Sequence, residues 1–128
     1  MARRREIDWG SSFERDIGYV RALVSGEWIF VSGCTGGDPE TGVLPDDVSR
    51  QCANTLAKIG RALAEAGGSF ADVVRVHYIL RDAADFEPCW PQLRAAFAAG
   101  RPAATMIVAG LIDPAMRIEI EVTAHRPG

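Results

Sequence analysis

The chain has 128 residues, of which 48% are hydrophobic and 24% charged, a composition typical of one globular domain over residues 1–128 and not of a disordered segment. Its net charge of −3 argues against a nucleic-acid partner, because such proteins usually carry a basic excess or a basic stripe. No apolar run suits a signal peptide or approaches the ~20 residues of a membrane helix, so a cytoplasmic protein without a membrane partner is expected.

The N-terminal part of the chain reads as a basic terminus followed by two strands. The run Arg3-Arg4-Arg5 precedes Glu6 and Asp8, and we interpret it as a solvated, frayed end. Residues 17–24 and 27–34 are rich in strand-forming side chains, and the Ser25-Gly26 dipeptide between them favours a hairpin turn.

A long helix follows a loop rich in glycine. Asp46 or Asp47 can cap its start, and Gly67-Gly68 ends it, where a left-handed backbone is needed. Its apolar residues recur at steps of three and four and so predict one buried face. They are Val48, Cys52, Leu56, Ile59, Leu63 and Ala66.

The second half predicts a strand at residues 72–80, a helix from Pro88 to Gly100, and two final strands at 103–109 and 117–124. Two helical crossovers imply parallel strand pairs, whereas the first hairpin and a final hairpin imply antiparallel pairs. The sequence therefore predicts an α+β fold, with a mixed sheet and two helices packed on one face.

The second face of this sheet carries apolar residues as well. Residues 28–31 are apolar on both sides, and Val73 and Ile79 are expected beside Arg75 and His77. A sheet that is apolar on both faces must be covered on both, so we expect another copy of the chain to cover the second one. The ionisable groups there are candidates for a ligand site.

The number and positions of the cysteines and of the lysine disfavour several kinds of structural and catalytic site. Cys34, Cys52 and Cys89 are odd in number and lack zinc-binding spacing, which disfavours a disulfide framework and a metal site. Lys58 is the single lysine and lies off the apolar stripe of its helix, which disfavours Schiff-base chemistry. His77 and Cys34 have catalytic readings, but a hydrogen-bonded structural histidine and a small buried cysteine are the interpretations we prefer.

Short motifs in a fixed order run along nearly the whole chain, and together they resemble the Rid/YjgF family, formerly labelled endoribonuclease L-PSP. The matching segments are Gly18-Tyr19-Val20, Val31-Ser32-Gly33, Pro39-Glu40-Thr41-Gly42, Gln51, Asn54, Ala66-Gly67, Asp72-Val73-Val74, Asp85-Phe86, Pro102-Ala103 and Ile118-Glu119-Ile120-Glu121.

The resemblance implies a chorismate-mutase-like fold, assembled as a homotrimer with sites in the clefts between subunits. It implies hydrolysis of reactive enamines and imines, such as 2-aminoacrylate, to keto acids and ammonia, without a metal or organic cofactor. By the same resemblance, Glu119 is the catalytic carboxylate that orients the attacking water, and Tyr19, Ser32 and Gly33 contact the small-molecule ligand.

Three departures from the family pattern alter the implied pocket. Ala104 stands where the deaminases hold the arginine that grips the substrate carboxylate, Trp90 replaces an asparagine, and Met106 replaces a cysteine. Thr105 lies between two of these positions, and the resemblance implies that all four residues contact the ligand. Arg75 or Arg117 can supply a displaced positive charge; without one, the pocket should favour an uncharged or aromatic ligand.

Three functions stay open at this point. The first is a Rid-family hydrolase or deaminase with altered specificity, which should act weakly or not at all on 2-aminoacrylate. The second is a metabolite-binding trimer that has lost catalysis. The third is a ribonuclease, which the acidic balance of the chain disfavours.

Overall fold

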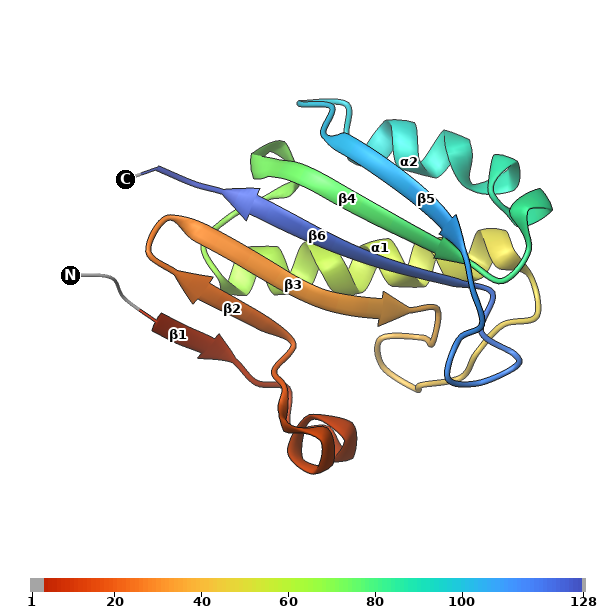
Figure 1. Ribbon diagram of the computed structural model, residues 1–128, viewed down its shortest axis with the longest axis horizontal. Coiled ribbons are helices and arrows are strands. Elements are labelled where there is room, and N and C mark those ends of the chain that lie inside the picture. The colour runs from red at the N-terminus through yellow and green to blue at the C-terminus, as the bar shows by residue number, and fades with distance from the viewer. Residues whose placement is uncertain (1–3, 128) are drawn as a thin grey trace.

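The computed structural model describes residues 4–127 and arranges six strands in one mixed sheet with the helices on one face (Figure 1). The sheet order is β1-β2-β3-β6-β4-β5, in which only β4 and β5 pair in parallel. The predicted α+β fold is confirmed. The strands are β1 (Arg4–Ile7), β2 (Ala22–Ser25), β3 (Trp28–Thr35), β4 (Val73–Leu80), β5 (Ala103–Val108) and β6 (Ile118–His125).

Within residues 4–127, the helices are two α-helices and four short turns of other helical types. Among the described residues, none is long and apolar enough to cross a membrane. The α-helices are α1 (Val48–Glu65) and α2 (Trp90–Ala96). The short turns are the π-helical η1 (Glu14–Gly18) and the 3₁₀ turns η2 (Phe70–Asp72), η3 (Ala83–Asp85) and η4 (Glu87–Cys89).

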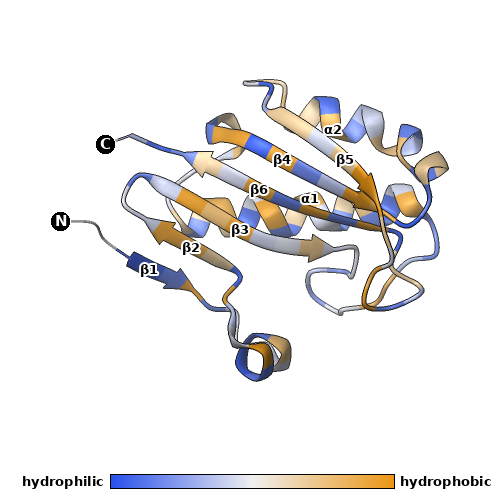
Figure 2. Cartoon of the chain, viewed as in Figure 1, coloured by the Kyte–Doolittle hydropathy of each residue, from blue (hydrophilic) through white to orange (hydrophobic). Residues whose placement is uncertain are grey.

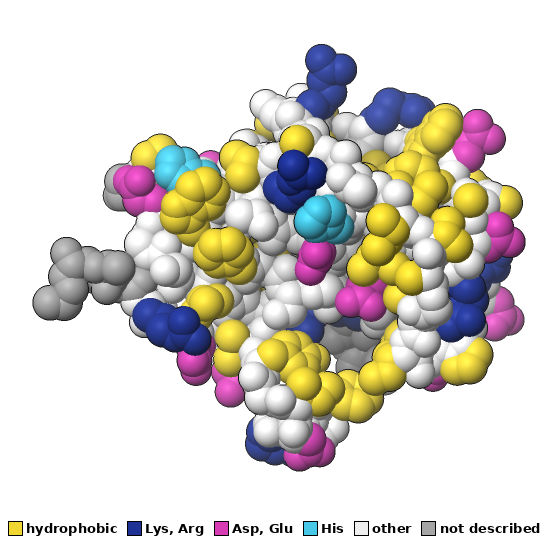
Figure 3. Space-filling view, viewed as in Figure 1, with side chains coloured by type: hydrophobic (Ala, Val, Ile, Leu, Met, Phe, Trp, Pro, Cys, Tyr) yellow, Lys and Arg dark blue, Asp and Glu magenta, His cyan; other side chains and the backbone are white. Residues whose placement is uncertain are grey.

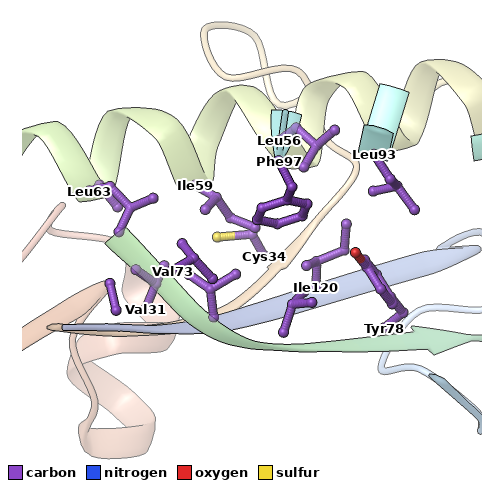
Figure 4. Close-up of a cluster of buried hydrophobic side chains, with 14 of the residues drawn as sticks. Val31, Cys34, Leu56, Ile59, Leu63, Val73, Tyr78, Leu93, Phe97 and Ile120 are labelled. Carbon is purple, nitrogen blue, oxygen red and sulfur yellow. The ribbon is translucent and has the colours of Figure 1, made fainter. Parts of the chain in front are cut away.

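Helix α1 forms where the sequence predicts it. The Asp47 carboxylate accepts hydrogen bonds from the backbone N–H groups of Ser49 and Arg50, which satisfies two donors of the first turn. Gly67 follows the helix with φ of +90°, a conformation that glycine adopts without steric cost. The predicted apolar stripe is buried, and Figure 4 shows its side chains packed against the sheet.

Strand β6 carries the most regular part of the core. Ile118, Ile120, Val122 and Ala124 are all buried against the helices, as their alternation predicts. Each large side chain buried in this way contributes roughly 1.5–3 kcal/mol to folding. The intervening positions, from Glu119 to His125, lie on the face that the helices leave open.

The predicted final hairpin is wrong. Strand β6 pairs with β3 and β4 in the middle of the sheet, whereas β5 lies at the edge beside β4. The difference follows from burial, because β6 alternates strictly between buried and half-buried residues while most of β5 is exposed. The strand with the continuous core face takes the central place.

The N-terminal region also differs from expectation. Only residues 22–24 of the predicted strand 17–24 belong to a strand, β2, and residues 14–18 form the η1 turn instead. Arg4 and Arg5 belong to the edge strand β1, so the basic run is not frayed there; Arg3 lies outside the described residues. The cause is Glu14, whose buried carboxylate draws in backbone N–H groups from both sides of the turn.

A register shift changes which side chains share a face in β4. The β4–β6 pairing slips between Val73 and Arg75, so Val73 turns into the core. The expectation that Val73 lies beside Arg75 and His77 is therefore wrong. The open face of β4 carries Arg75, His77 and Ile79, none of which is fully buried.

The open face of the sheet is partly apolar, as Figure 3 shows, and Figure 2 shows hydrophobic residues along the strands. In β3, Trp28 and Phe30 are 44% and 43% exposed, whereas Ile29 and Val31 are 2% and 3% exposed. Trp28 packs on His125 of β6, with ring centroids 4.6 Å apart. Apolar side chains thus occupy both faces of β3, as the sequence predicts.

Candidate functional site

A pocket of about 560 Å³ lies where β3, the start of β6, the η1 turn and the loop before β6 meet. Figure 3 shows the molecule hollowed between the η1 turn and that loop. Four residues singled out in the sequence line it together: Tyr19, Ser32, Gly33 and Glu119. The fold thus brings Glu119, the catalytic carboxylate that the resemblance implies, into one cavity with the three implied ligand contacts.

A β-bulge in β3 shapes the floor of this pocket. Val31 pairs with Val122 and Cys34 pairs with Ile120, so two residues of β3 oppose one residue of β6. The bulge contains Ser32 and Gly33, and the Ser32 hydroxyl donates a hydrogen bond of 2.7 Å to the carbonyl of Val20. This bond fixes the N-terminal segment against the strand end.

Gly33 is needed because Glu119 lies directly over it. A Cβ atom at position 33 would overlap the Glu119 carboxylate. The bulge also turns Cys34 into the core, where it is buried, and burial raises the pKa of its thiol. The interpretation of Cys34 as a small buried residue is therefore confirmed.

Glu119 is a half-buried carboxylate without a bonding partner. Among residues 4–127, no hydrogen bond or ion pair is made by its side chain, and its oxygens face the pocket. Burial is the main cause that raises its pKa above the usual range; the nearby Glu121 carboxylate adds to this, and Arg21 opposes it. A raised pKa brings a carboxylate closer to the basicity that a general base needs near neutral pH.

Glu14 is the contrasting carboxylate of the same pocket. Its oxygens accept hydrogen bonds from the backbone N–H groups of Trp9, Ser11 and Arg21 at 3.0–3.1 Å, and from the Ser11 hydroxyl at 2.7 Å. Burial acts to raise the pKa of Glu14, but these hydrogen bonds outweigh it and hold the pKa below the usual value. Glu14 therefore holds the pocket wall together.

Two cations that the sequence analysis did not select also line the pocket. Arg21 donates through one guanidinium nitrogen to the Gly33 carbonyl and the Cys34 Sγ, both at 2.9 Å, and through the other to the Tyr19 hydroxyl at 3.4 Å. Lys58 reaches the pocket from α1. The sequence signals that could have identified these two residues were weak. Arg21 is a single charge in an apolar segment, and Lys58 is a lysine outside the apolar stripe of its helix.

The remaining predicted ligand contacts lie elsewhere in the chain. Ala104, Thr105 and Met106 belong to β5, and Met106 packs against the core cluster. Trp90 begins α2, is 42% exposed and packs edge-on against Phe86. None of these four lines the pocket within the same described chain.

Both arginines considered as displaced charges have partners. Arg117 forms a two-bond pair with Asp85, at 3.1 and 2.7 Å, and also donates to the carbonyl of Asp46. Arg75 donates to the Thr105 hydroxyl at 3.2 Å on the open face of the sheet. Arg117 therefore ties the loop before α1 to the start of β6 and is not available to a ligand.

His77 forms a pair with Glu121 across β4 and β6, with 2.8 Å between His77 Nδ1 and Glu121 Oε1. This contact agrees with the preferred interpretation of a hydrogen-bonded histidine. Among residues 4–127, no group of three or more histidine, cysteine, aspartate or glutamate side chains is arranged to hold a metal ion.

Comparison with known proteins gives a consistent result. The family model described as endoribonuclease L-PSP matches residues 11–126. The chain is 37% identical to the 3-aminoacrylate deaminase RutC of Acinetobacter baylyi over 109 residues, which are 84% of this chain and 86% of that protein. It is 32% identical to the 2-iminobutanoate/2-iminopropanoate deaminase of Rattus norvegicus over 107 residues, which are 83% and 78% of the two chains.

The solved structures agree with the sequence relatives. A member of the YjgF/YER057c/UK114 family from Mycobacterium tuberculosis superposes with a TM-score of 0.87 at 33% identity, over 96% of this chain and 99% of that one.

Proposed function

We propose that this chain, which belongs to the Rid/YjgF family, hydrolyses a small imine or enamine and releases ammonia. Two of its relatives carry the names of enamine and imine deaminases. The observation that carries the proposal is the half-buried Glu119 carboxylate, which lines the pocket and has no bonding partner among residues 4–127. A carboxylate in that state is free to accept a proton from water.

The chemistry needs one base and one water molecule. An enamine first takes a proton on carbon and becomes an iminium ion, which an imine also becomes when its nitrogen is protonated. The water oxygen then bonds to the iminium carbon while Glu119 accepts a water proton, which gives a neutral tetrahedral amino alcohol. Return of that proton to nitrogen lets the carbon–nitrogen bond break, so that ammonia leaves, the hydroxyl proton passes to water and a carbonyl compound remains. No oxidant or reductant is consumed.

A homotrimer with the site between subunits is the second part of the proposal. Trp28 and Phe30 leave an apolar area on the open sheet face that another subunit can cover. Such packing offers Trp90, Ala104, Thr105 and Met106 a place in a neighbouring subunit's cleft, as the family resemblance implies. Light scattering coupled to gel filtration tests this, and a monomer at micromolar concentration contradicts it.

The acidic balance of the chain does not favour RNA cleavage. Its net charge is −3, and a chain of this charge repels a phosphate backbone. RNA cleavage that survives stringent purification and the Glu119→Gln substitution would support the ribonuclease alternative. Ligand-induced thermal stabilisation without turnover would support the binding-protein alternative.

The specificity is expected to differ from that of the arginine-bearing deaminases. Ala104 offers a methyl group where an arginine would form two charge-assisted hydrogen bonds, each worth roughly 1.5–3 kcal/mol. Without another cation in the pocket to bind the substrate carboxylate, turnover of enzymatically generated 2-aminoacrylate should therefore be weak, and Ala104→Arg should increase it. Ammonia release from 2-aminoacrylate at the rate of an arginine-bearing relative would contradict this specificity, whereas no release from any imine tested would contradict hydrolysis.

A further inference from the structure

We infer that Arg21 and Lys58 form an anion-binding subsite in the pocket, and that this subsite holds the carboxylate of an imine or enamine acid. The inference rests on the proposed function and adds two specificity residues to it. The family resemblance supplied neither residue, and the position it did supply for the carboxylate clamp is occupied by Ala104.

Arg21 is fixed in place with part of its donor capacity unused. Its NH1 group is bound to Gly33 and Cys34, and its NH2 group reaches the Tyr19 hydroxyl. The guanidinium also lies over the rings of Trp9 and Tyr19, at 5.8 and 5.7 Å from their centroids. A guanidinium has five N–H donors, so Nε and one hydrogen of NH2 are left for a ligand. A cation held this way loses little freedom when it binds an anion.

Lys58 supplies the second charge. It enters the pocket from α1, and burial is the main cause that lowers its pKa, with the charge of Arg21 acting in the same direction. Arg21 and Lys58 line the same pocket. Within residues 4–127, neither cation forms an ion pair with a carboxylate.

The placement of the two cations relative to Glu119 suits the reaction. Arg21 donates to the carbonyl of Gly33, and the Glu119 carboxylate lies over that same residue. Glu119 lines the same pocket as Arg21, and the positive charge of Arg21 opposes the rise in the pKa of Glu119. A small acid bound by Arg21 and Lys58 therefore has its neighbouring carbon–nitrogen bond near the catalytic carboxylate.

The test measures binding of a keto acid, the product class, and does not depend on turnover. Isothermal titration with 2-oxobutanoate and with its uncharged amide should show that the wild-type chain prefers the carboxylate. Lys58→Met keeps most of the side-chain volume and removes the charge, so it should weaken 2-oxobutanoate binding about tenfold or more and leave the amide unaffected. Lys58→Arg should restore most of the affinity.

The matched control is Arg50→Met, which removes an exposed cation from the same helix outside this pocket. It should leave binding of both compounds unchanged. Arg21→Gln should also weaken 2-oxobutanoate binding, and its melting temperature will show whether the fold survives loss of the Gly33 and Cys34 contacts. Equal affinity of Lys58→Met and wild type for 2-oxobutanoate overturns the inference, as does a wild-type chain that binds neither compound at millimolar concentration.

The two proposals fail in different ways. If 2-oxobutanoate binds in a Lys58-dependent manner but no imine is hydrolysed, the anion subsite stands and the proposed hydrolysis fails. If imines are hydrolysed and Lys58→Met changes neither KM nor keto-acid affinity, hydrolysis stands and the subsite fails. Glu119→Gln should abolish turnover and keep the binding of 2-oxobutanoate, which separates the base from the binding residues.

Discussion

Glu14 and Glu119 line one pocket, but the protein surrounds them in opposite ways. Glu14 is 4% exposed, accepts hydrogen bonds from three backbone N–H groups and a hydroxyl, and has a lowered pKa. Glu119 is half-buried, has no bonding partner among residues 4–127, and has a raised pKa. The Glu14 carboxylate stabilises the fold. The Glu119 carboxylate is available to react, and its partial burial lowers the stability of the fold.

The largest expected effect is on catalysis at Glu119. Glu119→Gln keeps the shape of the side chain and removes the base, so hydrolysis of any accepted imine should fall about 10²–10⁴-fold. Ammonia release measures this, with Glu40→Gln as the control because that exposed glutamate lies outside the pocket. Full activity in the Glu119 variant would mean that another group activates water.

The next effect is on stability at Glu14. Glu14→Gln places an amide NH₂ group among N–H donors and removes the negative charge, so the free energy of unfolding should fall by roughly 2–4 kcal/mol. Denaturant unfolding at neutral pH measures the loss. Asp16→Asn in the same turn is the control, because Asp16 is exposed.

The sign of the pH dependence follows from the lowered pKa of Glu14. The ionised carboxylate stabilises the fold above the pKa that it has in the unfolded chain, and this contribution is lost as the pH falls through the lowered pKa of the folded state. The difference between wild type and Glu14→Gln should therefore shrink on acidification. A difference that is constant across this range would show that packing and not charge explains it.

A smaller effect is expected where Gly33 meets Glu119. Gly33 does not have a positive φ, so alanine fits the backbone, but its Cβ would displace the end of the Glu119 side chain. Gly33→Ala should lower activity roughly ten- to a hundredfold through misplacement of the base. The cost in stability should stay below about 1 kcal/mol, because the displaced group is flexible. Gly110→Ala is the control, since a Cβ there has no neighbour within 4 Å.

The same comparison explains which features could be predicted from the sequence. Helix α1 and strand β6 follow from periodicity, because one side of each is buried without interruption. The η1 turn has no such signal: the side chain of Glu14 joins Trp9 to Arg21, which are separated by 11 intervening residues of irregular chain. Contacts of this kind depend on one residue and leave no repeat in the sequence.

The sequence predicted the site residues that lie on strands β3 and β6. It did not predict the residues whose long side chains extend into the pocket from other positions. Glu119 and Gly33 were selected through family motifs, and the structure places the Glu119 carboxylate over Gly33. Arg21 was not selected from its predicted strand, and Lys58 was noted only as lying off the apolar stripe of its helix. Only the bulge at Ser32 and Gly33, and the packing of the N-terminal segment on it, place both cations in the pocket.

The smallest effect expected is a gain of stability in Glu119→Gln at neutral pH. The pKa of Glu119 is raised in the folded chain, so the folded state binds its proton more tightly than the unfolded state does. Above both pKa values the carboxylate is charged in each state, and folding must bring that charge into a half-buried place beside Glu121. This penalty disappears as the pH falls below the ordinary carboxyl range, because the group is then neutral in both states. Glu119→Gln should thus melt slightly higher than wild type at pH 7 and at the same temperature in acid, as thermal scans of both proteins across pH can show.

Glu14→Gln should melt lower than wild type at pH 7, which makes the pair a direct test of the roles assigned to the two carboxylates. A lower melting temperature for Glu119→Gln at pH 7 would mean that the charge of Glu119 stabilises the fold, and the contrast between the two carboxylates would then be wrong.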